Sequence, residues 1–353
     1  MEKENEQKMP RRKFLQVGGS VLAGGTIVGL AGMLFHKRLV VQDVPYGANI
    51  VTPQPDIPTS PYRRVTSIEI PEEISTFELA ENKLVAATAQ TVYVYNETGE
   101  LERKFSRFEN EISYEDNRIS YGENLRGTAY LNGSLYLLFP THIEVYTIDG
   151  RKLREWVACD EQSDYCEIAV APDGVFVTDA ANKNIHKYTL DGTFVKFIQS
   201  PDGFVIPSYS FGITYSDGVL YCSNSGRHRV EKYTTDGEYL GSFGEAGAGV
   251  GRFCGCCNPV HLSHTATGDI ITSEKGIPRI SCYSPDGRFQ SLLLDTKVLG
   301  GGHTAYGVKV KGDKLFVAGA NRIDTYRYDQ TAVAQTACAA CVVNCPLRQG
   351  ITV

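Results

Sequence analysis

The sequence predicts an all-β fold, a six-bladed β-propeller, and two observations support that prediction. A pattern of four short apolar or alternating segments, separated by turns, recurs six times along the 353 residues. The third segment of each copy ends in Tyr, and these tyrosines lie 51, 42, 45, 50 and 43 residues apart. A period of about 45 residues with four strands per unit is typical of propeller blades, which stack around an axis because one blade cannot bury both of its faces. The predicted third strands are 92–95, 143–146, 185–188, 230–233, 280–283 and 323–326.

The two ends of the repeat region indicate how the ring closes. The sixth copy ends without a fourth strand, whereas 65–70 alternates in hydropathy ahead of the first inner strand near 75–79. We expect 65–70 to supply the missing outer strand of the last blade, because this pairing removes an open sheet edge. The propeller is therefore predicted to span 65–330, followed by a Cys-rich C-terminal tail, 331–353.

The composition agrees with a folded body and argues against nucleic-acid binding. The chain has 35 Lys and Arg against 41 Asp and Glu, a formal net charge of −6, so it offers no overall basic field for DNA or RNA. Hydrophobic residues make up 42% of the chain, and 35 glycines accompany 20 tyrosines. Many glycines among many aromatic residues favour short strands joined by tight turns. We therefore expect no nucleic-acid partner.

Residues 1–38 resemble a twin-arginine export signal. The stretch 10–16 reads PRRKFLQ, and a run without ionisable residues follows at 17–35. Paired arginines before a Gly-rich apolar segment are typical of such signals, although Pro10 and Gln16 depart from the usual pattern. The resemblance implies an extracytoplasmic location, on the periplasmic or cell-surface side.

The same segment could remain in the membrane as an anchor helix. As a helix, 17–35 has a length of about 28 Å, which just spans a bilayer core. No Ala-x-Ala cleavage site lies between 29 and 41, whereas the glycines of the run lower its helix propensity. The sequence is therefore compatible both with cleavage after this segment and with its retention as a membrane anchor. The Pro-rich segment 39–64 is interpreted as an extended spacer that leads to the propeller.

The central copies resemble NHL repeats. Residues 212–244 read GITYSDGVLYCSNSGRHRVEKYTTDGEYLGSFG, and the resemblance covers about 75–328, most strongly in blades three to five. The stretch CGCCNPVHL at 254–262, which contains a Gly-Cys-Cys-Asn-Pro motif, is similar to a group of exported bacterial NHL-type propellers. NHL-type propellers range from protein and RNA binders to lyases and lactonases. The resemblance therefore implies the fold and leaves the function open.

Most of the ten cysteines are predicted to lie at one face of the ring. In a propeller, the links from an outer strand to the next inner strand share a face with the turns between second and third strands. Cys282 falls inside a third strand and is expected to be plain core. The six cysteines expected at the shared face are Cys159, Cys166, Cys222, Cys254, Cys256 and Cys257.

The tail carries a pattern of cysteines that is similar to a metal-binding motif. Its Cys-x2-Cys-x3-Cys-Pro resembles the last three ligands of a bacterial ferredoxin run, with Gln335 at the first position. The resemblance implies an iron–sulfur cluster, and the export pathway, which moves folded proteins often loaded with a cofactor, supports that expectation. Soft thiolates suit zinc equally well. The predicted metal ligands are Cys338, Cys341 and Cys345 of the tail, with the missing sulfur supplied by Cys254, Cys256 or Cys257.

Disulfides are the competing interpretation of the same cysteines. An exported chain with an even number of cysteines is a candidate for disulfide bonding. Cys159 and Cys166 are close enough in the sequence for a local bridge. Cys256 and Cys257 are adjacent and would bridge each other only with strain.

Three histidines near the predicted channel are further candidates for chemistry. His261 begins an inner strand, His264 follows on the same strand, and His303 lies in a Gly-rich approach to blade six. They could ligate a channel metal such as zinc or calcium, as histidines do in some propeller lyases, or bond to backbone at the rim. Glu274 and Lys275 end a second strand on the same face and either position a ligand at the channel mouth or form a surface ion pair.

Three functions follow from these patterns. The first is an exported or membrane-anchored propeller that acts as a binding or redox accessory module, holds a Cys-ligated iron–sulfur or other metal centre, and takes a protein redox partner or ligand at the propeller face. The second is a disulfide-stapled scaffold that binds a protein or glycan. The third is a metal-assisted hydrolase or lyase. We expect a binding or electron-transfer module rather than an enzyme.

Overall fold

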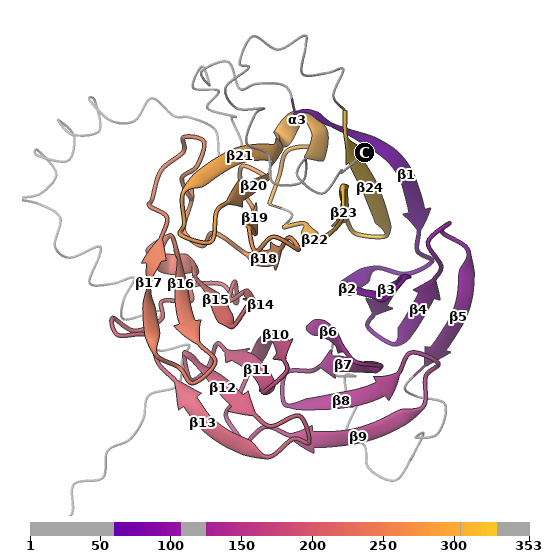
Figure 1. Ribbon diagram of the computed structural model, residues 1–353, viewed down its shortest axis with the longest axis vertical. Coiled ribbons are helices and arrows are strands. Elements are labelled where there is room, and N and C mark those ends of the chain that lie inside the picture. The colour runs from indigo at the N-terminus through magenta and orange to yellow at the C-terminus, as the bar shows by residue number, and fades with distance from the viewer. Residues whose placement is uncertain (1–59, 107–124, 304, 330–353) are drawn as a thin grey trace, which may run out of the picture. The chain divides into compact units, whose positions relative to one another are not determined.

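The computed structural model describes residues 60–106, 125–303 and 305–329. These residues form six four-stranded antiparallel sheets around a common axis, which confirms the predicted all-β six-bladed propeller (Figure 1). The segment predicted as a signal or anchor, most of the predicted spacer and the tail lie outside the described residues. Within the part of the chain that is described, no helix has the length and hydropathy needed to cross a membrane.

The first three blades follow one another along the chain, each from its inner to its outer strand. Blade one contains β2 (Ile74–Ala80), β3 (Lys83–Thr88), β4 (Thr91–Tyr95) and β5 (Leu101–Ser106). Blade two contains β6 (Gly127–Leu131), β7 (Ser134–Leu138), β8 (His142–Thr147) and β9 (Lys152–Val157). Blade three contains β10 (Tyr165–Ala171), β11 (Gly174–Asp179), β12 (Asn184–Tyr188) and β13 (Phe194–Ile198).

The next two blades repeat this order, and each of them also contains or precedes one short helix. Blade four contains β14 (Ile213–Ser216), β15 (Val219–Asn224), η1 (Ser225–Arg227), β16 (Arg229–Thr234) and β17 (Tyr239–Phe243). Blade five contains β18 (His261–His264), β19 (Ile270–Glu274), β20 (Arg279–Tyr283) and β21 (Phe289–Leu294), and α3 (Thr296–Leu299) follows it. Every predicted third strand is present within β4, β8, β12, β16, β20 or the β24 strand of blade six.

Blade six joins the two ends of the propeller. It contains β22 (Gly307–Lys311), β23 (Lys314–Ala318), β24 (Arg322–Tyr328) and, as its outer strand, β1 (Tyr62–Glu69). Figure 1 shows the indigo β1 beside the yellow β24, and the two pair antiparallel from Tyr62 with Tyr328 to Glu69 with Arg322. The predicted closure is confirmed, although the strand begins at Tyr62 rather than at residue 65. The outer strand begins early because Tyr62 is an apolar anchor, 1% exposed and packed edge-on against Tyr328.

The core consists of apolar layers between neighbouring blades. One such layer packs Ile271 and Cys282 of blade five against Val308 and Leu315 of blade six, so Cys282 is core as predicted. The turns after the third strands reach the preceding blade. A Cβ on Gly192, whose φ is +96°, would lie 2.6 Å from the Trp156 ring of the blade before it. Glycine is required there both by the left-handed conformation and by this close approach.

Candidate binding site on the start face

The inner strands begin at one face of the ring, which we call the start face. The links that precede β10, β14 and β18 arrive at this face, and so do the turns between second and third strands, because neighbouring strands are antiparallel. Cys159 lies in the link before β10. Cys254, Cys256 and Cys257 lie in the link before β18. The strand order therefore brings these four cysteines to the face that the sequence predicted.

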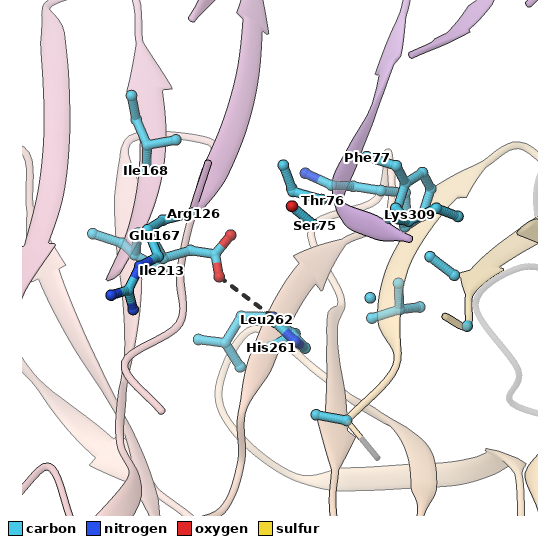
Figure 2. Close-up of a pocket in the computed structure, with 16 residues that line it drawn as sticks. Ser75, Thr76, Phe77, Arg126, Glu167, Ile168, Ile213, His261, Leu262 and Lys309 are labelled. Atoms are coloured by element: carbon cyan, nitrogen blue, oxygen red, sulfur yellow. Dashed lines mark hydrogen bonds and ion pairs between the residues drawn. The ribbon is translucent and has the colours of Figure 1, made fainter. Parts of the chain in front are cut away.

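A small cavity of about 90 Å³ opens at the mouth of the central channel on the start face. Figure 2 shows Glu167 of β10 and His261 of β18 pointing toward each other across it, with Arg126 beside Glu167. His261 Nδ1 lies 3.3 Å from Glu167 Oε2. Because these strands belong to blades three and five, this pair spans the mouth and joins residues that are 94 positions apart.

Glu167 reaches the mouth because β10 contains a bulge. The pairing of β10 with β11 shifts between Tyr165 and Glu167, which leaves Cys166 as an extra residue. A bulge bends its strand and re-aims the side chains next to it. The backbone N–H of Glu167 then bonds to Thr178 Oγ1 at 3.1 Å, and the Thr178 hydroxyl donates to the Phe211 carbonyl at 2.7 Å. These bonds fix the carboxylate at the channel entrance.

Arg126 provides the positive charge of the mouth. Its guanidinium lies 3.5 Å from Asp164 Oδ1 and 5.6 Å from the centre of the Tyr209 ring, and 35% of its side chain stays exposed. The other cation of the cavity, Lys309, is bound to Glu78 at 2.7 Å. The mouth therefore presents a partly exposed guanidinium next to an imidazole–carboxylate pair, and these are residue types that suit an anionic group and proton transfer.

The second part of the site is a pair of adjacent thiols. Cys256 Sγ lies 3.3 Å from Cys257 Sγ, well beyond the about 2.05 Å of a disulfide, so both are free thiols. Cys256 is exposed and Cys257 is buried. Asn258 holds this link against β19, because its amide donates to the Cys254 carbonyl at 2.6 Å and accepts from the Lys275 N–H at 2.9 Å.

Charge and hydrogen bonding make the two thiols unequal. Burial acts to raise the pKa of Cys257, but hydrogen bonds with Ser208, Cys256 and Lys275, together with the charge of Lys275, outweigh it and lower that pKa below the ordinary value. The hydrogen bond with Cys257 raises the pKa of Cys256. Cys257 is therefore the thiol of the pair that loses its proton first, with the exposed Cys256 as its hydrogen-bond donor.

A run of contacts joins the thiol pair to the channel mouth. Lys275 Nζ donates to Ser208 Oγ at 2.9 Å and to Ser210 Oγ at 3.1 Å. Tyr209 lies between these serines and is 59% exposed, and the Arg126 guanidinium covers its ring. The thiols, the ammonium, the exposed ring and the guanidinium therefore form one continuous surface on the start face.

Glu274 lies beneath this surface rather than on it. Its side chain is 1% exposed and receives two hydrogen bonds from Arg279, 3.1 Å from Nε and 2.7 Å from Nη2. Glu274 and Arg279 are direct cross-strand partners at the ends of β19 and β20. The surface ion pair expected from the sequence is wrong for Glu274, because its pair with Arg279 is buried, and the buried side chain does not line the channel mouth.

The predicted metal ligands are only partly gathered. Cys254 is buried, its N–H lies 3.4 Å from Glu274 Oε2, and burial raises its pKa. In the described ranges, the one group of three His, Cys, Asp or Glu ligand atoms that lie within 4.8 Å of one another does not include a cysteine. Cys338, Cys341 and Cys345 lie outside the described residues, so a centre that uses them stays a prediction.

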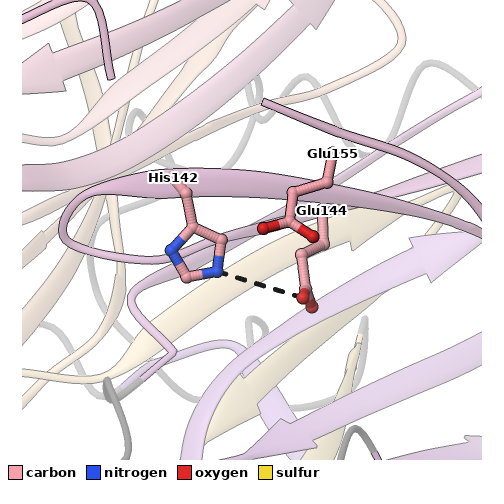
Figure 3. A group of neighbouring side chains, drawn as sticks. All are labelled: His142, Glu144 and Glu155. Carbon is pink, nitrogen blue, oxygen red and sulfur yellow. Dashed lines mark ion pairs between the residues drawn. The ribbon is translucent and has the colours of Figure 1, made fainter. Parts of the chain in front are cut away.

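That three-residue group lies in blade two and consists of His142, Glu144 and Glu155 (Figure 3). Lys152 Nζ already lies 2.8 Å from Glu144 Oε1 and 2.6 Å from Glu155 Oε2. The His142 ring stacks on Phe139 with centroids 4.6 Å apart. Because one ammonium already bridges both carboxylates, the geometry is that of a structural ion-pair network rather than a metal site.

The three candidate histidines have different surroundings. His261 belongs to the mouth, whereas His264 lines a separate cavity of about 270 Å³ and its Nδ1 lies 2.9 Å from Thr214 Oγ1. Burial lowers the pKa of His264 to about 4, so this imidazole is neutral at pH 7. His303 is exposed in the approach to blade six. A shared metal stays a prediction that these positions do not by themselves support.

The cysteines of the predicted disulfide have different partners in the structure. Cys159 Sγ lies 3.4 Å from His186 Nδ1, whereas Cys166 Sγ lies 3.7 Å from the Asp164 carbonyl. Cys166 also packs in an apolar cluster with Cys222. Both candidate cysteines are free thiols in this structure. The bridge stays a prediction that mass spectrometry under non-reducing conditions tests.

Sequence reasoning missed several residues of the site. Arg126 and Glu167 lie at inner-strand starts, as His261 does, so a comparison of these positions in all six copies would have marked them. Asn258 belongs to the Cys-Cys-Asn-Pro stretch, in which the sequence indicated a role only for the cysteines. Nothing in the sequence indicates that Tyr209 meets Arg126, because the two residues lie far apart in the chain and belong to different links.

Comparison with known proteins supports the fold but does not assign the chain to a family. No protein-family model and no curated protein matches the chain. Among solved structures, virginiamycin B lyase from Staphylococcus aureus is 15% identical with a TM-score of 0.53, over 75% of this chain and 99% of the lyase. A catalytically inactive form of that lyase with quinupristin is 16% identical with a TM-score of 0.52, over 72% and 80% of the two chains. A streptogramin B lyase is 15% identical with a TM-score of 0.51, over 75% and 97%. At such identities the similarity shows that this chain shares the six-bladed propeller fold of these lyases.

Proposed function

We propose that this propeller is a binding module whose start face holds a thiophilic metal centre through Cys256 and Cys257 and takes a partner at the adjoining channel mouth. One observation carries the proposal, namely that the two sulfurs lie 3.3 Å apart, one of them exposed, beside the ammonium of Lys275. Thiolates are the ligands that zinc and iron–sulfur clusters prefer. The charge of Lys275 favours the thiolate form that binds metal.

Two donors do not complete a metal centre, and the tail offers the rest. Structural zinc and iron–sulfur sites use four protein ligands in most proteins. The Cys-x2-Cys-x3-Cys-Pro pattern of the tail has three cysteines, and a four-ligand centre that uses Cys256 and Cys257 needs two of them. The proposed location outside the cytoplasm rests on the resemblance of residues 10–16 to a twin-arginine signal, a pathway that suits a centre loaded before export.

The channel mouth is proposed as the anchor for the partner. Its cavity of about 90 Å³ is far smaller than the roughly 300–1,000 Å³ that encloses a drug-sized ligand. It therefore suits one polar end group of a larger partner rather than a whole small molecule. The guanidinium of Arg126 and the imidazole of His261 favour an acidic group, and the exposed Tyr209 ring offers an apolar contact beside it.

A second candidate is a lyase or hydrolase that works at the same mouth. The contact between His261 and Glu167 is the observation that favours it, because an imidazole oriented by a carboxylate is a common general base. The propeller fold is also that of virginiamycin B lyase. Turnover of quinupristin by this chain, lost in His261→Ala and kept in His303→Ala, would replace the first proposal with this one.

Metal analysis after anaerobic purification tests the first proposal. The full chain should contain zinc or iron, and the double variant Cys256→Ser/Cys257→Ser should lose that metal, because it removes both donors of the start face. Cys159→Ser is the matched control, since it replaces another exposed thiol of the same face, and it should keep the metal. A metal-free native chain, or an equal metal content in all three proteins, would contradict the proposal.

A further inference from the structure

A second reactive arrangement lies at Cys159, apart from the thiol pair and the channel mouth. Cys159 is exposed in the link between β9 and β10, and its sulfur lies 3.4 Å from Nδ1 of His186. His186 belongs to β12 and is completely buried. An exposed thiol therefore contacts the edge of a buried imidazole, which is the relation of a nucleophile to its base.

A buried carboxylate lies behind the imidazole. His186 Nε2 lies 3.3 Å from Asp179 Oδ2, and neither side chain is exposed. The other oxygen, Oδ1, accepts the N–H groups of Asp164 at 3.1 Å and Ala181 at 2.9 Å. Burial acts to raise the pKa of Asp179, but hydrogen bonds from His186 and from backbone N–H groups outweigh it and hold that pKa well below the ordinary value. The carboxylate is therefore ionised and places the imidazole proton on Nε2.

Two tyrosines form hydrogen bonds around Nδ1 of His186. The Tyr165 hydroxyl lies 3.1 Å from Nδ1 and is hydrogen-bonded to the Tyr188 hydroxyl, which in turn accepts the N–H of Cys159 at 3.1 Å. Burial raises the pKa of both tyrosines, so they stay protonated. With Nε2 protonated, Nδ1 is the acceptor nitrogen, and the chain of hydroxyls holds the Cys159 backbone so that its sulfur stays beside it.

The surroundings exclude water from the base. The His186 ring meets the Phe197 ring edge-on with centroids 4.8 Å apart and the Tyr165 ring at 5.2 Å. A purely structural histidine at such a depth normally satisfies both ring nitrogens with hydrogen bonds. Here Nε2 has only the 3.3 Å contact with Asp179, without a well-aligned hydrogen bond, and Nδ1 is shared between the Tyr165 hydroxyl at 3.1 Å and the surface thiol at 3.4 Å.

We propose that Cys159 is a thiol–disulfide exchange site, in which His186 acts as general base, Asp179 positions His186, and the substrate is the disulfide of a small thiol. His186 Nδ1 takes the thiol proton while Cys159 Sγ attacks one sulfur of the disulfide. The new bond joins Cys159 to that sulfur, the original S–S bond breaks, and the leaving thiolate takes the proton back from His186. The number of disulfides is unchanged, so the step needs no further oxidant.

This site differs from the thiol pair in how its sulfur is activated. Burial raises the pKa of Cys159, the charges of Asp160 and Asp179 add to that effect, and a hydrogen bond with Tyr188 opposes it. Cys159 therefore keeps its proton at neutral pH and depends on His186, whereas the pKa of Cys257 is lowered by its hydrogen bonds and by the charge of Lys275. The proposal stands whether or not the start face binds metal.

Exposure of the reduced full chain to oxidised glutathione at pH 7 tests the proposal. Trypsin releases residues 155–183, which contain Cys159 and Cys166, and fragment ions distinguish the two sulfurs. We expect glutathione on Cys159. In His186→Asn its rate should fall at least tenfold relative to that of the native chain treated in parallel with the same reagent. Glutathione on Cys166, a bond between Cys159 and Cys166, or an unchanged rate would overturn the proposal.

A measurement on the native chain decides the question if the His186 variant does not fold. The rate of Cys159 alkylation by iodoacetamide is followed from pH 6 to pH 10. A thiol of raised pKa without a base should lose about tenfold in rate for each unit below its pKa. A rate at pH 7 that lies clearly above this extrapolation supports the base, and a rate that follows the extrapolation contradicts it. In Asp179→Asn, the alkylation rate of Cys159 should fall with pH more nearly as expected for a thiol without a base. A loss of packing alone would not change this pH dependence.

Discussion

Replacement of Tyr62 with Ala should lower the free energy of unfolding by about 3–5 kcal/mol, the range for deletion of a large buried aromatic side chain. Tyr62 is 1% exposed, contacts Tyr328 edge-on with ring centroids 5.6 Å apart, and packs in the apolar cluster shared by blades five and six. It is also the first residue of the strand that closes the ring. Loss of its side chain weakens the strand pairing that closes the described propeller. Chemical denaturation of the full chain measures the change.

Val65→Ala is the matched control for this prediction. Val65 lies in the same strand, β1, but is 50% exposed, so its replacement should change the free energy of unfolding by less than about 0.5 kcal/mol. Equal effects of the two substitutions would show that β1 contributes through its backbone pairing alone. That outcome would contradict the role assigned to Tyr62 as the anchor of the closure.

Replacement of Arg279 with Met should cost about 3–5 kcal/mol, because it leaves the Glu274 carboxylate buried without its partner. Arg279 is 2% exposed, and besides Glu274 it binds the carbonyls of Ala248 and Gly249 at 3.0 Å and of Arg252 at 2.7 Å. These carbonyls belong to the link that leads to the thiol pair. The variant should therefore also accelerate alkylation of Cys254, which is buried in the native chain.

The pH dependence of the Arg279 variant has a defined sign. Burial raises the pKa of Glu274 even in the native chain, and loss of Arg279 removes the first influence that opposes this. A carboxyl group whose pKa is higher in the folded than in the unfolded state binds more protons when folded, so stability falls as pH rises. The deficit of Arg279→Met should therefore be smaller at pH 5 than at pH 8.

Two controls define the Arg279 result. Arg252→Met removes an exposed pair with Glu245 in the same link and should have an effect below about 1 kcal/mol. The double variant Glu274→Gln/Arg279→Met, which buries no charge, should recover part of the loss. A double variant that is no more stable than Arg279→Met would show that the carbonyl contacts of Arg279, and not the buried charge, dominate.

The fold could be predicted from the sequence because the propeller repeats a local pattern. Each third strand ends in Tyr and is followed by a tight turn, and the glycine of such a turn, as at Gly192, touches the preceding blade. The closing strand was predictable because one copy lacked its outer strand while an unassigned alternating segment lay at the other end. The spacing of the tyrosines and the alternation in hydropathy are sufficient to predict the blades and the closing strand, because both depend on strand order and not on side-chain contacts.

The site was less predictable because its contacts join residues far apart in the chain. Glu167 and His261 meet only once the ring has closed, and the bulge at Cys166 that places Glu167 leaves no mark in the hydropathy pattern. Glu274 pairs with Arg279 and not with the surface, a partner that strand register determines. The position of Cys256 and Cys257 in the link before β18 was predictable, because it depends on strand order, and adjacent residues stay close however a link folds.

The most direct test of the start-face site is whether Cys256 and Cys257 of the folded full chain act together. Phenylarsine oxide bridges two neighbouring thiols, and bridged thiols are protected from later alkylation, which is mapped on the tryptic peptide 253–275. The proposed site predicts protection of both cysteines in the native chain and in Cys254→Ser, and loss of protection in Cys257→Ser. Protection that requires Cys254, or free alkylation of Cys256 and Cys257 in the native chain, would contradict it.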